Sequence, residues 1–134
     1  MKTGIVCGAF DIIHPGYIDM FRQAKLVCDR LIVALQTDPT IDRPEKMAPI
    51  HTVQEREIIL KSIRYVDDVI IYSSEDSLIE VLKFIRPDVR ILGSDYRGKK
   101  FTGDHLNIPI FFVERYHNWS TTNTKQKISS KGTK

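Results

Sequence analysis

Short apolar segments alternate along this chain with segments of helical periodicity, and this alternation constrains the fold more than any other feature. Strands are expected at 4–10, 30–37, 66–72, 88–93 and 108–114. The second of them, "RLIVALQT", is apolar almost throughout, which is typical of a strand covered on both faces. Strands that alternate with helices build a parallel sheet with right-handed crossovers. The sequence therefore predicts an α/β fold, a doubly wound parallel five-stranded sheet of Rossmann-like type.

The segments between the expected strands carry the signals of helices. In 15–28, apolar side chains recur at spacings of three and four, which lines one helix face. Thr52 and Glu55 form a capping box that opens a helix through about Arg64. Ser74 caps a third helix, with acidic residues in its first turn. These helices supply the covering layers that a parallel sheet needs.

Length and composition indicate one domain of ordinary character. The 134 residues suit a single core, and we expect a domain at 1–128, ending in a short helix at 120–128, before a disordered basic tail at 129–134. The net charge of +3 is spread over scattered basic residues, so no nucleic-acid partner is expected. No apolar run approaches the ~20 residues of a membrane span. No signal-peptide pattern opens the chain, so we expect a cytoplasmic protein with no membrane partner. Cys7 and Cys28 lack C-x-x-C spacing and are expected to be buried free thiols.

Three polar stretches follow expected strands: "GAFDIIHPGY", "GSDYRGKKFTGD" and "ERYHNWSTT". Ligands of open parallel sheets bind at the carboxyl ends of the strands, where these stretches meet. In the first, Pro15 suits the opening position of a helix, which places His14 at its cap. Free backbone N–H groups at a helix start favour an anion, usually phosphate. Alternatively, His14 only caps the helix and Tyr17 belongs to the core; the residues alone favour neither interpretation.

Residues 93–100, "GSDYRGKK", have the glycine and lysine spacing of a P-loop. However, Lys100 stands where a Ser or Thr should hold Mg²⁺, and the segment that follows is not typical of a helix. The segment also follows the fourth expected strand rather than the first. A P-loop is therefore rejected, and Gly98 and Gly103 are expected to permit a mobile loop over the site.

The segment "GAFDIIHPGYIDMFRQAK" resembles the first signature of the nucleotidylyltransferases, Gly-x-Phe-Asp-x-x-His-x-Gly-His. The segments "EREIILKSIRYVDDVI", "LGSDYRGK" and "ERYHNWSTTNTKQKI" resemble, in order, those of glycerol-3-phosphate cytidylyltransferases. The resemblance implies transfer of CMP from CTP to a small phosphorylated polyol or sugar, with release of pyrophosphate and assistance from Mg²⁺. It also implies a homodimer. Because this chemistry uses no covalent enzyme intermediate, catalysis would consist of positioning and charge stabilisation.

The resemblance further implies roles for individual residues. As catalytic residues it implies His14, Tyr17, Lys46 and Arg115. As nucleotide-binding residues it implies Gly8, Ala9, Phe10, Asp11, Gly16, Arg64, Asp95, Ser120, Thr121 and Thr122. Arg56 and His117 are expected to bind phosphate or substrate, and no metal ligand is identified. Guanidinium groups and hydroxyls are effective phosphate binders, which suits these residue types.

Some of these residues have a simpler alternative role. Arg56 lies on an exposed-looking helix and could be merely solvated. Arg64 could form a surface ion pair with Asp67 or Asp68, which would contribute little stability. Lys46 could be an ordinary loop lysine. For these positions the structure must decide between a ligand contact and a solvated side chain.

Two departures from the family pattern leave the activity open. Tyr17 stands where the signature has its second His, and a phenol donates a hydrogen bond without being a cation near pH 7. Tyr17 could replace that His as a neutral donor, His117 could supply an imidazole from the last loop, or the protein could bind nucleotide without turnover. The segment "RYHNWSTT" also replaces Arg-Thr-Glu-Gly-Ile-Ser-Thr-Thr, so Tyr116 and Trp119 could reshape the acceptor pocket, and Ser120 could be only a helix cap. Adenylyl transfer to a phosphorylated cofactor precursor is the alternative activity.

Overall fold

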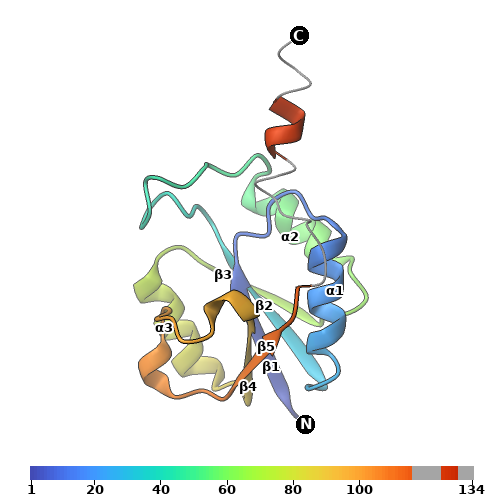
Figure 1. Ribbon diagram of the computed structural model, residues 1–134, viewed down its shortest axis with the longest axis vertical. Coiled ribbons are helices and arrows are strands. Elements are labelled where there is room, and N and C mark those ends of the chain that lie inside the picture. Colours follow the sequence, from blue (N-terminus) through green and yellow to red (C-terminus); the bar gives the residue numbers. More distant parts are fainter. Residues whose placement is uncertain (116–124, 130–134) are drawn as a thin grey trace.

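All the strands of the described chain pair in parallel, in the order β3-β2-β1-β4-β5. The computed structural model describes residues 1–115 and 125–129 (Figure 1). Its strands are β1 (Thr3–Gly8), β2 (Arg30–Gln36), β3 (Asp68–Tyr72), β4 (Val89–Gly93) and β5 (Ile110–Val113). The predicted five-stranded parallel sheet is confirmed. The first strand ends before Ala9 and Phe10, which the sequence had placed in it.

Helices cover both faces of the sheet, as the doubly wound prediction requires (Figure 1). They are α1 (Pro15–Ala24), α2 (Val53–Lys61) and α3 (Glu75–Ile85), with single 3₁₀ turns at η1 (Ser94–Tyr96) and η2 (Asp104–Leu106). Residues 125–129 are also helical. α1 and α2 end earlier than predicted, because the amides that follow bond to carbonyls three residues back and tighten the chain into a turn.

The core consists of two apolar layers, one on each side of the sheet. α1 and α2 contribute the first layer, in which Phe21 and Leu60 are fully buried against Val33 and its neighbours. α3 contributes the second layer, in which Leu78 and Leu82 pack over the other face. The near-continuous apolar run of β2 is buried on both sides, as predicted.

The strand order places a switch point between β1 and β4. The chain moves outward in one direction from β1 through β2 to β3, and then returns to add β4 and β5 on the other side. The loops that follow β1 and β4 therefore diverge to opposite faces. A crevice opens between such loops, and it is where sheets of this type bind ligands.

Candidate active site

A cleft of about 640 Å³ lies at this switch point, over the carboxyl ends of the strands. The turn after β1, the loop after β2, the start of α3 and the loop after β4 all contribute to its walls. Arg115 and Lys125 complete it from the carboxyl-terminal part. The predicted convergence of polar stretches is therefore observed for the first two, and Arg115 represents the third. His117, Ser120, Thr121 and Thr122 lie outside the described residues, as do Tyr116 and Trp119.

The turn after β1 is tightly wound. Phe10 and Ile12 have φ values of 49° and 48°, in the left-handed region that side chains other than glycine rarely adopt. The buried Phe10 ring anchors this turn against Phe21 in the core. A Cβ on Gly8 would lie 3.3 Å from the Phe10 ring, so glycine permits that close approach. Strain of this kind persists where surrounding packing enforces it, and it is common at ligand sites.

His14 and Tyr17 form a stacked pair at the start of α1. His14 is the N-cap, and its Nδ1 accepts the Gly16 N–H at 3.1 Å. The neutral imidazole consequently carries its hydrogen on Nε2, the nitrogen that can donate to an anion. The two rings are 4.3 Å apart and nearly parallel, and Tyr17 also meets Phe10 edge to face. Tyr17 lines the cleft, whereas His14 lies beside it in a shallow surface depression. Capping and packing are thus observed, and contact with a ligand stays a prediction for both.

Asp11 ties three segments together from a buried position. Its carboxylate accepts N–H groups from Ile50 at 2.6 Å and from His51 at 3.0 Å, and it pairs with Lys125 at 2.7 Å. Burial alone would raise its pKa, but Lys125 and the two amides outweigh burial and lower it. The His51 ring lies nearby, with Nδ1 3.9 Å from the carboxylate. The sequence assigned His51 no role, because nothing local indicates that this loop returns to the turn.

Arg56 differs from its prediction. Its side chain is 1% exposed, so the expectation of an exposed helix face is wrong. The guanidinium donates to four carbonyl oxygens: Ala9 at 2.9 Å, Gln36 at 2.6 Å, Thr37 at 2.5 Å and His51 at 3.1 Å. Four of its five N–H groups therefore hold the ends of β1 and β2 to the loop before α2. In this arrangement Arg56 is a positioning residue for the cleft.

Arg64 is exposed and is not among the residues that line the cleft. The alternative ion pairs predicted for it are wrong. Asp67 pairs with Lys25 at 2.7 Å, and Asp68 pairs with Arg30. The structure therefore does not bring Arg64 to the site, and its nucleotide-binding role stays a prediction.

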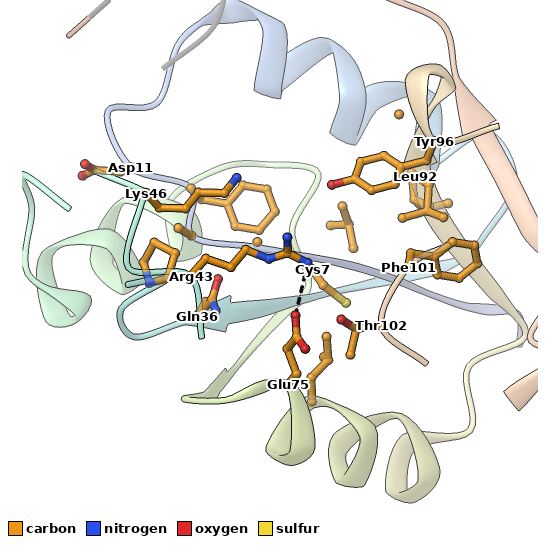
Figure 2. A pocket seen from close by; sticks show the side chains of 18 of the residues that line it. Cys7, Asp11, Gln36, Arg43, Lys46, Glu75, Leu92, Tyr96, Phe101 and Thr102 are labelled. Atoms are coloured by element: carbon orange, nitrogen blue, oxygen red, sulfur yellow. Dashed lines mark hydrogen bonds and ion pairs between the residues drawn. The ribbon is translucent and has the colours of Figure 1, made fainter. Parts of the chain in front are cut away.

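Cationic side chains outnumber carboxylates along the cleft wall. The cations are Arg43, Lys46, Arg90, Lys100, Arg115 and Lys125, and the carboxylates are Asp11, Asp42, Glu75 and Asp95. Figure 2 shows the Arg43 guanidinium reaching into the cleft, with an ion pair to Glu75 at 3.3 Å. Asp42 accepts the Glu75 N–H at 2.9 Å, which fixes the loop after β2 to the start of α3. This wall, with its excess of positive charge, suits a polyphosphate.

The loop after β4 forms the opposite wall. A Cβ on Gly93 would lie 2.6 Å from Asp95 Oδ1, so glycine lets this carboxylate fold back over the strand end. Gly98 and Gly103 have φ values of 72° and 84°, in the left-handed region that favours glycine, and the mobility expected of this loop stays a prediction. Residues 104–106 form one 3₁₀ turn instead of an α-helix, so the rejection of a P-loop is confirmed. Figure 2 shows the Tyr96 hydroxyl directed into the cleft from this loop.

Fold and site together define a class: a parallel α/β domain with a cationic cleft at its switch point, beside a helix start capped by a histidine. Comparison with known proteins specifies the family. Residues 5–132 match the family described as cytidylyltransferase-like, and the chain belongs to that family. It is a nucleotidyltransferase, as the sequence predicted.

The relatives and solved structures support this assignment. The bifunctional protein HldE of Caulobacter vibrioides is 34% identical over 97% of this chain, and that of Paramagnetospirillum magneticum is 35% identical over 96%. The chain spans only 28% and 27% of their lengths. The lipopolysaccharide core biosynthesis protein from Thermoplasma volcanium has a TM-score of 0.70 at 25% identity, covering 89% of this chain and 99% of that one. Pantoate-beta-alanine ligase from Francisella tularensis shares the fold, with a TM-score of 0.65 at 18% identity over 97% of this chain and 69% of that one.

None of the helices among residues 1–115 and 125–129 has the length and apolar character that crossing a membrane requires. Neither of the two cysteines is in a disulfide: Cys28 is buried, and Cys7 is half-buried at the cleft. Burial raises the pKa of the Cys7 thiol to about 11, although Arg90 opposes this. Cys7 is therefore protonated at neutral pH. The predicted thiols are confirmed, with Cys7 less buried than expected.

Proposed function

We propose that this protein transfers CMP from CTP to a small phosphorylated sugar or polyol and releases pyrophosphate. The observation that carries the proposal is the cationic cleft at the switch point, beside the start of α1. A nucleoside triphosphate fits there, because helix starts and cationic walls both stabilise phosphate oxygens. The name of the similar Thermoplasma volcanium protein refers to the lipopolysaccharide core, which supports a sugar as acceptor.

In the proposed reaction an oxygen of the acceptor phosphate forms a bond to the α-phosphorus of CTP. The bond from that phosphorus to the bridging oxygen breaks, and pyrophosphate leaves. His14 Nε2 and the first amides of α1 donate to the transferring phosphate, while Lys46 and Arg115 neutralise charge on the leaving group. Tyr17 holds the His14 ring in place by stacking. Such groups accelerate the reaction by positioning and charge stabilisation.

Magnesium fits the carboxylate content of the cleft. In the part of the chain that the structure describes, no three His, Cys, Asp or Glu side chains gather as metal ligands. Mg²⁺ commonly binds through one or two carboxylates together with substrate phosphates and water. Asp95 is the carboxylate on the cleft that would hold it, because Asp11 is paired with Lys125, Glu75 is paired with Arg43, and Asp42 accepts the Glu75 N–H. When bound, Mg²⁺ would neutralise part of the triphosphate charge.

Adenylyl transfer from ATP is the second candidate. The two relatives described above carry the name HldE rather than that of a cytidylyltransferase. The described residues leave the base specificity open, since residue types that stack on or bond to a base serve either nucleotide. The donor is therefore the first property to measure.

The test is thermal stability with Mg²⁺ and each of CTP, ATP, GTP and UTP, followed by pyrophosphate release with phosphorylated sugars and polyols. A ligand that binds the folded state raises the melting temperature by mass action. We expect a shift with CTP that His14→Ala abolishes. His105→Ala is the matched control, because His105 is exposed on η2 and lies outside the cleft lining.

A shift with ATP instead of CTP would move the proposal to adenylyl transfer. Binding of a nucleotide without pyrophosphate release, for every acceptor tried, would favour a nucleotide-binding protein without turnover. No shift with any nucleotide would overturn the proposal. We also propose that the protein is cytoplasmic and forms a homodimer. Light scattering after size-exclusion chromatography measures the oligomeric state.

A further inference from the structure

Arg90 is a buried cation on the α3 side of the cleft. It belongs to β4, pairs in register with Ile5 of β1, and is only 4% exposed. Its side chain nevertheless lines the cleft. Neither charge pattern nor family resemblance had indicated it, because a lone Arg in the strand "DVRILG" has no local signature.

The protein satisfies little of the hydrogen-bonding capacity of Arg90. Nη1 donates to the Thr102 carbonyl, the side chain also interacts with the Cys7 thiol, and the guanidinium lies over the Phe101 ring at 5.0 Å. Nε is buried and has no partner among the described residues. No carboxylate in 1–115 or 125–129 lies within ion-pair distance of the guanidinium. An uncompensated buried charge is unfavourable, so a bound anion would relieve it.

Cys7 and Tyr72, two titratable side chains that interact with Arg90, are neutral at physiological pH. Burial raises the pKa of the Cys7 thiol, and burial also raises the pKa of the Tyr72 phenol. Neither group therefore supplies an anion to Arg90. Figure 2 shows Cys7, Thr102 and Phe101 along one part of the cleft, apart from Lys46 and Asp11.

The pairing of β4 with β1 shows how far Arg90 lies below the turn that follows β1. Arg90 is level with Ile5, three residues before Gly8, which is roughly 10 Å along a strand. The reactive phosphate must lie above the turn that begins at Gly8, near the start of α1. A group that reaches Arg90 therefore lies far from the reactive phosphate. Gly103 covers the guanidinium closely, since a Cβ there would lie 3.2 Å from Nη1.

We propose that Arg90 selects the acceptor by binding a carboxylate at the end distal from the reactive phosphate. A guanidinium binds a carboxylate through two parallel N–H groups, and the buried Nε of Arg90 has no hydrogen-bond partner among the described residues. The acceptor class is then a phosphorylated sugar acid rather than a neutral polyol phosphate. This inference rests on the proposed nucleotidyl transfer, which defines the reactive phosphate of the acceptor, and on Arg90, which would bind its distal carboxylate.

The test compares 6-phosphogluconate with glucitol 6-phosphate, which differ in one terminal carboxylate. Their affinities are measured by calorimetry on the full chain with CTP and on the full chain with ATP. The wild type should bind 6-phosphogluconate at least about tenfold more tightly, since charge-assisted hydrogen bonds are the stronger kind. Arg90→Met should lose this preference, and Arg90→Lys should keep part of it. Lys100→Met is the matched control: this exposed cleft lysine should affect both probes equally.

Equal binding of the two probes by the wild type, binding of neither, or an unchanged preference in Arg90→Met would overturn the inference. Should Arg90→Met fail to fold, Arg90→Lys decides the matter, because an undiminished preference there would also contradict a guanidinium-specific contact. The nucleotide-induced shift is read separately. If that shift is present and the probe preference is absent, this inference alone fails. If the preference is present and no pyrophosphate is ever released, the proposed transfer fails instead.

Discussion

Arg56 and Arg90 are both buried arginines, but they differ in how far the protein satisfies the hydrogen-bonding groups of the guanidinium. Arg56, 1% exposed, donates to four backbone carbonyls that come from three separate segments. Arg90, 4% exposed, donates to one carbonyl and keeps a buried Nε without a partner among the described residues. The first site is complete without a ligand, whereas the second is complete only with one.

The difference shows how one residue type serves two purposes in a small domain. Loops at the carboxyl ends of the strands have carbonyls that no strand or helix pairs, and a buried guanidinium satisfies several at once. Arg56 does this together with Asp11, which accepts amides from the same loop before α2. Arg56 and Asp11 are thus framework residues, meaning buried charged groups that hold the loops of the cleft together, and Arg90 is not.

The strongest test of the comparison is Arg56→Met. We expect the free energy of unfolding to fall by roughly 3–5 kcal/mol, because four buried carbonyls would lose their donor. Urea denaturation followed by circular dichroism measures it. Arg64→Met is the control. Because Arg64 is exposed, this substitution should change the free energy of unfolding by less than about 0.5 kcal/mol. A loss below about 1 kcal/mol in Arg56→Met would contradict the framework role.

The second test is Asp11→Asn, with an expected loss of about 2 kcal/mol from weakened charge-assisted hydrogen bonds. Its effect should depend on pH. Because folding lowers the pKa of Asp11, its contribution is complete above the unfolded pKa of ~3.9 and is lost as pH falls below that value. Stability measured from pH 6 to pH 3 should therefore decline less steeply in the variant. Parallel pH profiles would show that Asp11 contributes nothing through its charge.

Tyr17→Phe sharpens the comparison on the ligand side. The ring contacts with Phe10 and His14 persist without the hydroxyl, so stability should change by less than about 1 kcal/mol. Because the phenol is predicted to donate a hydrogen bond to phosphate, kcat should fall by a factor on the order of 10². Steady-state pyrophosphate release measures this, and His14→Ala serves for comparison. A rate equal to that of the wild type would restrict Tyr17 to packing.

Arg90→Met should have the smallest effect in the absence of ligand. An apolar side chain of similar length replaces an uncompensated charge, so the free energy of unfolding should change by less than about 1 kcal/mol. Cys7 provides a second measurement, because Arg90 holds the pKa of its thiol below the value that burial alone would produce. Alkylation of Cys7 at pH 9 should thus slow, by a factor of about 2–10. A large loss of stability would make Arg90 another framework residue.

Local patterns carried most of the fold prediction. The apolar run of β2, the capping box at Thr52 and the cap at Ser74 depend on neighbours in sequence, and all three are observed. The ends of α1 and α2 were predicted too late. The apolar residues after each helix keep helical spacing, but the backbone amides there bond to carbonyls three residues back instead of four. Periodicity does not distinguish these cases.

Only part of the site was predicted, because only residues within one continuous segment give a local sequence signal. Gly8, Asp11 and Tyr17 belong to one continuous segment, so the sequence brought them to the cleft. Arg43 and Arg90 come from separate segments and gave no local signal.

The sequence by itself determined the alternation of strands and helices, the capped start of α1 and the family, because periodicity, caps and signatures are properties of short segments. Only the tertiary structure decided which charges are compensated. Arg56 was expected in solvent and is enclosed by carbonyls from distant loops, while Arg90 was passed over and is a buried cation. Burial and pairing depend on segments that meet only after folding, so no single stretch of the chain encodes them.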